Sequence, residues 1–265
     1  MRKLAVLFFS VLVAAALAQQ PKIQTLIITG QNVHDWRGVE EPLRKALEST
    51  GRFEVRIVEE FRGAGPETLA PYDLVVLNYY DRRNPALRWG ARADSALLDY
   101  VRSGKGLVVY HFALAAFDGW QEYEKICAGN WRPNNGHHSA AHDFTVTIKD
   151  PDHPITRGLK KSFTQPKDEL YANLKWQPAG SYRLLATAYD DHSLYKDPKQ
   201  PTPGAGIDQP MLWTTEYGKG RVFVTALGHD GPASSTPAFV TTFARGAEWA
   251  ATGAVTIAPP PELAQ

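Results

Sequence analysis

Three histidines of this 265-residue chain each follow a strand-like apolar run: His34, His111 and His229. An imidazole with an ordinary pKa of about 6.5 can transfer protons, bind a metal ion or donate a hydrogen bond to a sugar hydroxyl. In open α/β sheets, ligands bind beyond the carboxyl ends of the strands, so these side chains are expected to converge on one crevice. A glycine-containing loop between the last two adds a further group, His137, His138 and His142.

Each histidine also has a purely structural interpretation. His34 could cap a helix that begins near Trp36, and His111 could be a core residue bonded to a backbone carbonyl. His153 precedes a proline in a turn and is expected to shape that loop, and His192 lies in a polar stretch and is expected to be solvated. The site hypothesis therefore depends on several histidines converging rather than on any single one.

A pair of carboxylates, Asp168 and Glu169, lies in the segment KDELY. The aliphatic and aromatic residues that follow indicate that one carboxylate faces inward, where neighbouring histidines would perturb its pKa. The alternative is an exposed acidic turn.

A metal ion is a second possibility for the same residues. The chain has no HExxH, no CxxC and no short aspartate-rich calcium loop, so the strong zinc and calcium spacings are absent. Histidines from separate loops could still hold Zn²⁺ or another divalent cation, and the candidate ligands are His34, His111, His138 and His229.

Alternating strand and helix patterns must position these side chains. Parallel neighbours need crossover connections, which are usually helices, so the pattern predicts an α/β protein with a mostly parallel sheet covered on both faces. The segment 196–210, rich in proline, lysine and glycine, is predicted to be a surface loop or flap. Strands are expected at 23–29, 53–58, 72–78, 107–110, 144–148, 182–189, 210–214 and 220–226, and helices at 40–50, 94–106 and 236–251.

The two ends of the chain differ from its centre. Two basic residues, an apolar run over 4–17 and the sequence Ala-Leu-Ala predict a cleaved signal peptide at 1–18, and hence a periplasmic or secreted protein with no membrane anchor after cleavage. A single domain is expected over 19–255. The proline-rich segment 256–265 is expected to be a disordered tail.

Composition narrows the partners. The net charge is +1, from 29 basic and 28 acidic residues without a basic run, which argues against nucleic acid. Seven tryptophans and eleven tyrosines suit the binding of sugars and small polar ligands as well as an ordinary core. One cysteine, Cys127, excludes an intramolecular disulfide.

Several motifs in order resemble the ThuA-like, or trehalose-utilisation, family: GKGLVVYHFA, GHHSAAHDFTVTIKDPDHPITRGL, DELY and YGKGRVFVTALGHD. The resemblance extends from about Thr25 to Ala251. It implies a three-layer, flavodoxin-like sandwich similar to class I glutamine amidotransferases, and a link to the metabolism of disaccharides, in particular 3-keto glycosides.

Glutaminase activity is excluded by the same comparison. Amidotransferases of that fold place a nucleophilic cysteine at the sharp turn after the strand that corresponds to 107–110. This chain has His111 at that turn, and its only cysteine, Cys127, lies downstream in an expected helix.

The resemblance and the residue types together define the predicted site. Either His137 or His138 is expected to enter it, and His138 is preferred because it stands four residues before His142. The chain is predicted to be an enzyme, a lyase or hydrolase of disaccharides or (keto)glycosides that uses histidine acid/base or metal-assisted chemistry; the alternative is a non-catalytic carbohydrate-binding protein. The predicted catalytic residues are His111, His138, Glu169 and His229, and the predicted substrate-binding residues are His34, Trp36, Trp131 and His142.

Overall fold

Short apolar segments form the parallel half of the central sheet. A computed structural model describes residues 20–195 and 202–265; the predicted signal peptide and residues 196–201 of the predicted flap lie outside the described residues. Neighbouring strands pair in parallel in the order β2-β1-β3-β4-β11, which corresponds to the flavodoxin-like order. These strands are β1 (Ile23–Ile28), β2 (Phe53–Val58), β3 (Leu74–Leu77), β4 (Gly106–Tyr110) and β11 (Gly220–Thr225).

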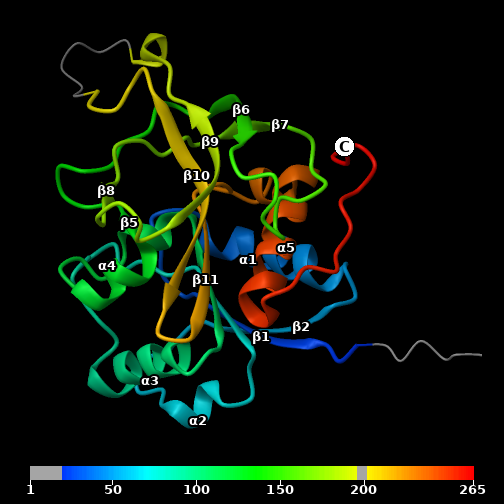
Figure 1. The fold of residues 1–265 in the computed structure, drawn as a ribbon. Helices are drawn as coiled ribbons and strands as arrows, with labels where there is room; N and C mark the ends of the chain where they lie inside the picture. Colours follow the sequence, from blue (N-terminus) through cyan, green and yellow to red (C-terminus); the bar gives the residue numbers. More distant parts are fainter. Residues whose placement is uncertain (1–19, 196–201) are drawn as a thin grey trace, which may run out of the picture.

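An antiparallel extension completes the described sheet, in the order β11-β10-β9-β6-β7 (Figure 1). Its strands are β10 (Asp208–Tyr217), β9 (Arg183–Tyr189), β6 (His142–Ile148) and β7 (Ser162–Asp168). The sequence did not predict β7, which contains Pro166; an edge strand accepts proline because one side of its backbone needs no partner. A separate two-stranded sheet pairs β5 (Gly129–Asn130) with β8 (Lys175–Trp176).

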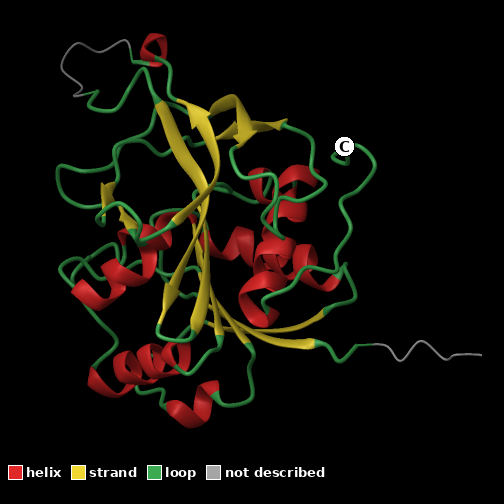
Figure 2. Ribbon diagram, in the orientation of Figure 1, coloured by secondary structure: helices red, strands yellow, loops and turns green. Residues whose placement is uncertain are grey.

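Helices cover both faces of the sheet, which gives three layers (Figure 2). Residues of α1 and α5 pack with Val108 and Tyr110 of β4, whereas residues of α2, α3 and α4 pack with Leu107 and Val109, which point to the other face. This confirms the predicted α/β three-layer fold, with a mixed sheet. The helices are α1 (Trp36–Glu48), α2 (Pro66–Leu69), α3 (Ala91–Arg102), α4 (Gln121–Cys127) and α5 (Pro237–Thr252), and three 3₁₀ helices are η1 (His111–Ala115), η2 (His192–Leu194) and η3 (Ala233–Ser235).

The start of α1 lies earlier than the sequence pattern indicated. The Asp35 side chain accepts the backbone N–H of Gly38 at 3.0 Å, so Asp35, and not His34, is the N-cap. The first turn is polar, which is why apolar spacing alone placed the helix start at Glu40. Across residues 20–195 and 202–265, the helices are too short or too polar to cross a membrane.

The C-terminal segment differs from the disorder expected of it. The backbone N–H of Lys160 donates to the carbonyl of Leu263 at 2.8 Å, and that of Gln265 donates to Gly158 at 3.0 Å. The Leu263 side chain is buried in the same core cluster as α5. Three consecutive prolines prevent a helix but do not prevent an extended segment from packing against the domain, so composition alone was misleading here.

Candidate functional site

The turn after β4 places His111 in an unusual backbone conformation. His111 has φ +45°, which a side chain with a Cβ rarely adopts, and it opens η1 directly after the strand. This is the strand–turn–helix geometry that presents a nucleophile in related α/β enzymes. The strand therefore delivers a buried imidazole to the carboxyl edge of the sheet.

Both ring nitrogens of His111 have defined neighbours. Nδ1 lies 2.8 Å from the carbonyl oxygen of Ala226, so Nδ1 carries the proton and donates it. The Tyr171 hydroxyl lies 2.6 Å from Nε2, which accepts from it when the ring is uncharged. The structural interpretation of His111, a core histidine bonded to a backbone carbonyl, is therefore correct for Nδ1. The Nε2 side of the ring faces polar groups.

Glu169 lies among three imidazoles. Its Oε2 is 3.6 Å from Nε2 of His111 and 3.7 Å from Nε2 of His34, and its Oε1 is 3.7 Å from Nε2 of His138. The rings of His34 and His111 have centroids 4.8 Å apart. The expected convergence of histidines from separate loops therefore occurs, and we call these four residues the histidine–glutamate cluster.

The loops fix each member by local hydrogen bonds. Asn32 Oδ1 accepts the backbone N–H groups of Val33 and His34, which shapes the β1–α1 loop. His138 Nδ1 donates to the carbonyl of Ser139 at 2.7 Å, which leaves Nε2 facing Glu169. His137 points elsewhere: its Nε2 lies 3.5 Å from Asp190, and its backbone pairs with Ala172.

His229 forms a separate pair with Asp168. The His229 Nδ1 lies 2.9 Å from Asp168 Oδ1, and the buried carboxylate also accepts the backbone N–H groups of Gly228 at 2.7 Å and His229 at 3.0 Å. Its ring centroid is 6.2 Å from that of His34 and 6.4 Å from that of His111. His229 therefore borders the cluster but is oriented by Asp168 rather than toward Glu169.

Burial and charge set different protonation states for these groups. Burial, together with the neighbouring His111, lowers the pKa of His34 to about 3, so that ring is neutral. The hydrogen bond to Asp168 raises the pKa of His229. Burial opposes ionisation of Asp168 and Glu169, but the hydrogen bond from His229 outweighs it for Asp168, and the nearby imidazole of His111 outweighs it for Glu169, so the pKa of each carboxyl is lowered.

The sequence singled out several of these residues, including the pair Asp168 and Glu169, but it assigned no role in the predicted site to Asp168 or to Tyr171. Asp168, which orients His229, and Tyr171, which bridges His111 and His34 at 2.6 and 3.3 Å, both lie in the motif DELY. The alternative of an exposed acidic turn is wrong, and the inward-facing carboxylate is found, because Asp168 is fully buried and the Glu169 side chain is 13% exposed. The motif was the available signal, since both of its carboxylates and its aromatic residue enter the site.

Two of the predicted substrate-binding residues lie outside the cluster. Trp36 begins α1, where the guanidinium of Arg37 stacks 3.9 Å from its ring centroid. His142 begins β6 and its Nδ1 contacts the hydroxyl of Ser139 and the carbonyl of Ala140. Neither side chain is directed at Glu169 by a contact described within residues 20–195 and 202–265.

Trp131 lies beside the cluster. Its ring centroid is 5.0 Å from that of Tyr171 and 5.9 Å from that of His138. Trp131 also lines a cavity of about 400 Å³, together with polar groups that include Asp118 and Arg132. A Cβ on Gly136, whose φ is +113°, would lie 2.5 Å from the Trp131 ring, so only glycine fits there.

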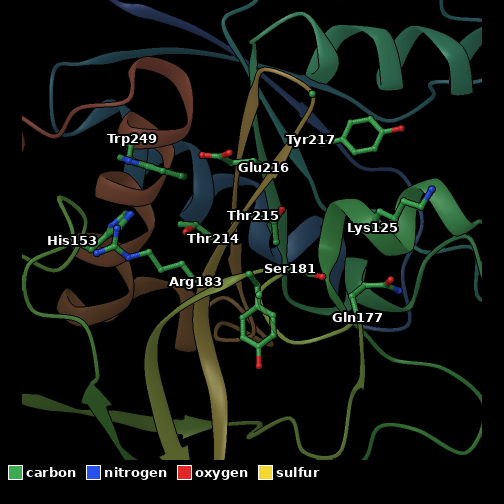
Figure 3. A pocket seen from close by; sticks show the side chains of 13 residues that line it. Lys125, His153, Gln177, Ser181, Arg183, Thr214, Thr215, Glu216, Tyr217 and Trp249 are labelled. Carbon is green, nitrogen blue, oxygen red and sulfur yellow. The ribbon is translucent and has the colours of Figure 1, made fainter.

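A larger cavity, about 570 Å³, lies at the opposite edge of the sheet, where β10 turns into β11 (Figure 3). Its basic side chains are already engaged, because Lys125 contacts Glu122 and Arg183 contacts Asp150. Among the described residues, this cavity therefore lacks a free set of titratable groups as close together as the one around Glu169. We therefore assign the candidate site to the histidine–glutamate cluster and not to the larger cavity.

Cys127 cannot replace the missing nucleophile. It is fully buried in α4, where burial raises the pKa of its thiol to about 12. The strand order is flavodoxin-like, as in the amidotransferase-like α/β proteins. The turn after β4 holds a histidine and not the thiol that glutamine hydrolysis needs.

The family model described as ThuA, trehalose utilisation, matches residues 24–250. The chain therefore belongs to the ThuA family, which confirms the resemblance drawn from its motifs. A search of curated proteins gave no match.

Solved structures share the fold. A ThuA-like protein from Parabacteroides merdae ATCC 43184 is 32% identical with a TM-score of 0.79, over 92% of this chain and 95% of that chain. A ThuA-like protein from Bacteroides uniformis ATCC 8492 is 18% identical with a TM-score of 0.65, over 92% and 96%. A cytoplasmic protein from Salmonella typhimurium LT2 is 16% identical with a TM-score of 0.57, over 83% and 96%.

Proposed function

We propose that this protein is an enzyme that acts on disaccharides or glycosides, with 3-keto glycosides as the preferred class, at the histidine–glutamate cluster. The observation that carries the proposal is the strained turn at His111, which directs an imidazole toward Glu169 and Tyr171 at the carboxyl edge of the sheet. Strain of this kind persists where a site requires it. The family description, trehalose utilisation, supports a sugar as substrate.

The adjacent cavity supports a sugar-sized ligand. Its volume of about 400 Å³ falls within the usual range of small-molecule sites, and Trp131 offers a flat face for a pyranose ring. Asp118 and Arg132 line the same cavity as an ion pair, with Oδ1 and Nε 3.2 Å apart. Trp131 links this cavity to the cluster, because its ring centroid lies 5.9 Å from that of His138.

The chemistry follows from the protonation states. A ketone at C3 acidifies the proton on C2, and His138 removes it through Nε2, because Nδ1 already donates to Ser139. The C–H electron pair becomes an enolate; its collapse forms the C1–C2 double bond and breaks the bond from C1 to the glycosidic oxygen. His229, whose pKa is raised by Asp168, donates the proton that the leaving oxygen needs.

Glu169 and Tyr171 support these steps. The Glu169 carboxylate, 3.7 Å from His138, stabilises the imidazolium that forms on proton abstraction. Burial raises the pKa of Tyr171 well above its ordinary value, so its hydroxyl keeps a proton for donation to an enolate oxygen.

The test is incubation of the purified protein with a panel of disaccharides, glycosides and their 3-keto derivatives, with product detection by mass spectrometry. We expect turnover of a keto glycoside by the wild type and a large loss in His111→Ala and His138→Ala. Unchanged turnover in both variants would refute the assignment of the site. Sugar binding without any product would favour the alternative, a carbohydrate-binding protein.

A further inference from the structure

One oxygen of the histidine–glutamate cluster lacks a partner. Glu169 Oε2 is buried and has no hydrogen-bond partner among the described residues. Its separations from the Nε2 atoms of His34 and His111, 3.7 and 3.6 Å, are too long for hydrogen bonds. A buried carboxylate oxygen without a partner is costly, so a missing positive group is the simplest physical explanation.

The spacing of the three donor atoms fits a cation. Metal–ligand bonds of about 2.0–2.2 Å separate neighbouring ligand atoms by roughly 3.0–3.5 Å. In His34, His111 and Glu169, one nitrogen or oxygen from each residue lies within 4.8 Å of the other two. Small side-chain rotations would therefore close the three atoms around an ion, and we infer that these three residues bind one divalent transition-metal ion.

Surrounding hydrogen bonds favour the ligating form of the rings. The Ala226 carbonyl holds the proton of His111 on Nδ1, which leaves the Nε2 lone pair directed into the site. The carbonyl of Ser139 does the same for His138, whose Nε2 lies 3.7 Å from Glu169 Oε1 and is positioned as a fourth donor. In this structure the Tyr171 hydroxyl donates a hydrogen bond to the lone pair of His111 Nε2, so the hydroxyl would move aside when the ion binds.

The types of the ligand atoms determine which class of metal ion binds, and the residues that supply them differ from the predicted ligands. Imidazoles with one carboxylate suit Zn²⁺, Co²⁺ or Fe²⁺ better than Mg²⁺ or Ca²⁺, which prefer oxygen alone. His229, predicted as a ligand, lies farther away, with its ring centroid 6.2 and 6.4 Å from those of His34 and His111 and its Nε2 3.4 Å from Asp230 Oδ2, and Glu169 takes its place. The ion's role would be to polarise the ketone oxygen; only that role rests on the proposed function.

The experiment strips the protein with a chelator, dialyses it against Zn²⁺ or Co²⁺, and measures metal content and affinity by competition with a coloured chelator. We expect one ion per chain. Affinity should fall at least about 100-fold in His111→Ala and in Glu169→Gln, since loss of even an outer-shell partner costs about 10–100-fold. His192→Ala, which changes an exposed histidine, and His229→Gln should bind the ion as the wild type does.

Thermal unfolding of the metal-free variants shows whether each one is folded, and Glu169→Gln serves as the decisive variant if His111→Ala does not fold. Failure of the wild type to bind the ion, or equal binding by Glu169→Gln, would overturn the inference. Binding at this site without sugar turnover would support the metal site and count against the proposed function. Equal turnover by metal-free and loaded protein would leave the proposed function standing and refute the ion's catalytic role.

Discussion

The two edges of the sheet hold polar groups in different ways. At the carboxyl edge of β4 and β11, the half-buried Glu169 faces three imidazoles at 3.6–3.7 Å and keeps a buried oxygen without a partner among the described residues. At the opposite edge, the larger cavity is lined by Lys125 and Arg183, which are paired with carboxylates of the protein itself. In this protein, convergent polar groups without partners identify the candidate site better than cavity volume does.

Catalytic loss should be confined to one edge. We expect His138→Ala to lower kcat/KM for a keto glycoside at least about 100-fold, because removal of a general base typically costs 10²–10⁴-fold. Lys125→Ala, at the other edge, should leave kcat/KM within about twofold of wild type. Steady-state kinetics on both variants measure the contrast, and an equal loss in the lysine variant would erase the distinction between the edges.

Stability should respond unequally to loss of a carboxylate at each edge. Asp168→Asn is expected to lower the free energy of unfolding by about 3 kcal/mol, because it breaks a buried charged pair with His229. Asp150→Asn removes the partner of the exposed Arg183 and should cost less than about 1 kcal/mol. Urea unfolding measures the loss of unfolding free energy in both variants. Similar losses would mean that the buried Asp168–His229 pair stabilises the protein no more than the Asp150–Arg183 pair does.

The pH dependence of stability should have opposite signs at the two edges. Burial lowers the pKa of His153, which lines the larger cavity, to about 4, against about 6.5 when unfolded. Between these values the unfolded state binds more protons, so stability falls as the pH drops from 7 to 5, by about 2 kcal/mol at most. Glutamine does not titrate in this range. The free energy of unfolding of His153→Gln, measured with urea at pH 7 and pH 5, should therefore not show this part of the decrease.

His229 should show the reverse behaviour. Its pKa is raised in the folded state by Asp168, so its stabilising contribution is fully present below the unfolded pKa of about 6.5 and is lost as the pH rises through the folded value. His229→Gln should therefore lose more stability at pH 6 than at pH 8. A greater loss at pH 8 would contradict the ion pair with Asp168.

The smallest expected contrast concerns two tryptophans. Trp131→Ala should raise KM for the sugar by roughly 2–10-fold, because aromatic stacking contributes about 0.5–1.5 kcal/mol, with a smaller effect on kcat. Trp249→Ala, in the larger cavity, should leave KM unchanged once the folded fraction is matched by circular dichroism. A raised KM only in the Trp249 variant would move substrate binding to the other edge.

Much of the site's location could be predicted from the sequence, but less of its internal arrangement. Apolar runs marked the strands, and the carboxyl ends of β1, β4 and β11 brought His34, His111 and His229 to one edge. The sequence pattern could not distinguish which ring nitrogens face which carboxylate. Trp36 and His142, chosen from the same loops, lie outside the cluster because their local contacts point them elsewhere.

The alternation of strands and helices, the histidine in place of a cysteine at the turn after β4, and the family could all be read from the amino-acid sequence. These depend on local periodicity and residue type, which the backbone geometry of strands and helices imposes directly. Only the tertiary structure decided that Asp168 orients His229 while its neighbour Glu169 meets His34, His111 and His138. The reason is that Asp168 is the last residue of β7 and Glu169 follows it, and the pairing of this edge strand with β6 depends on residues elsewhere in the chain.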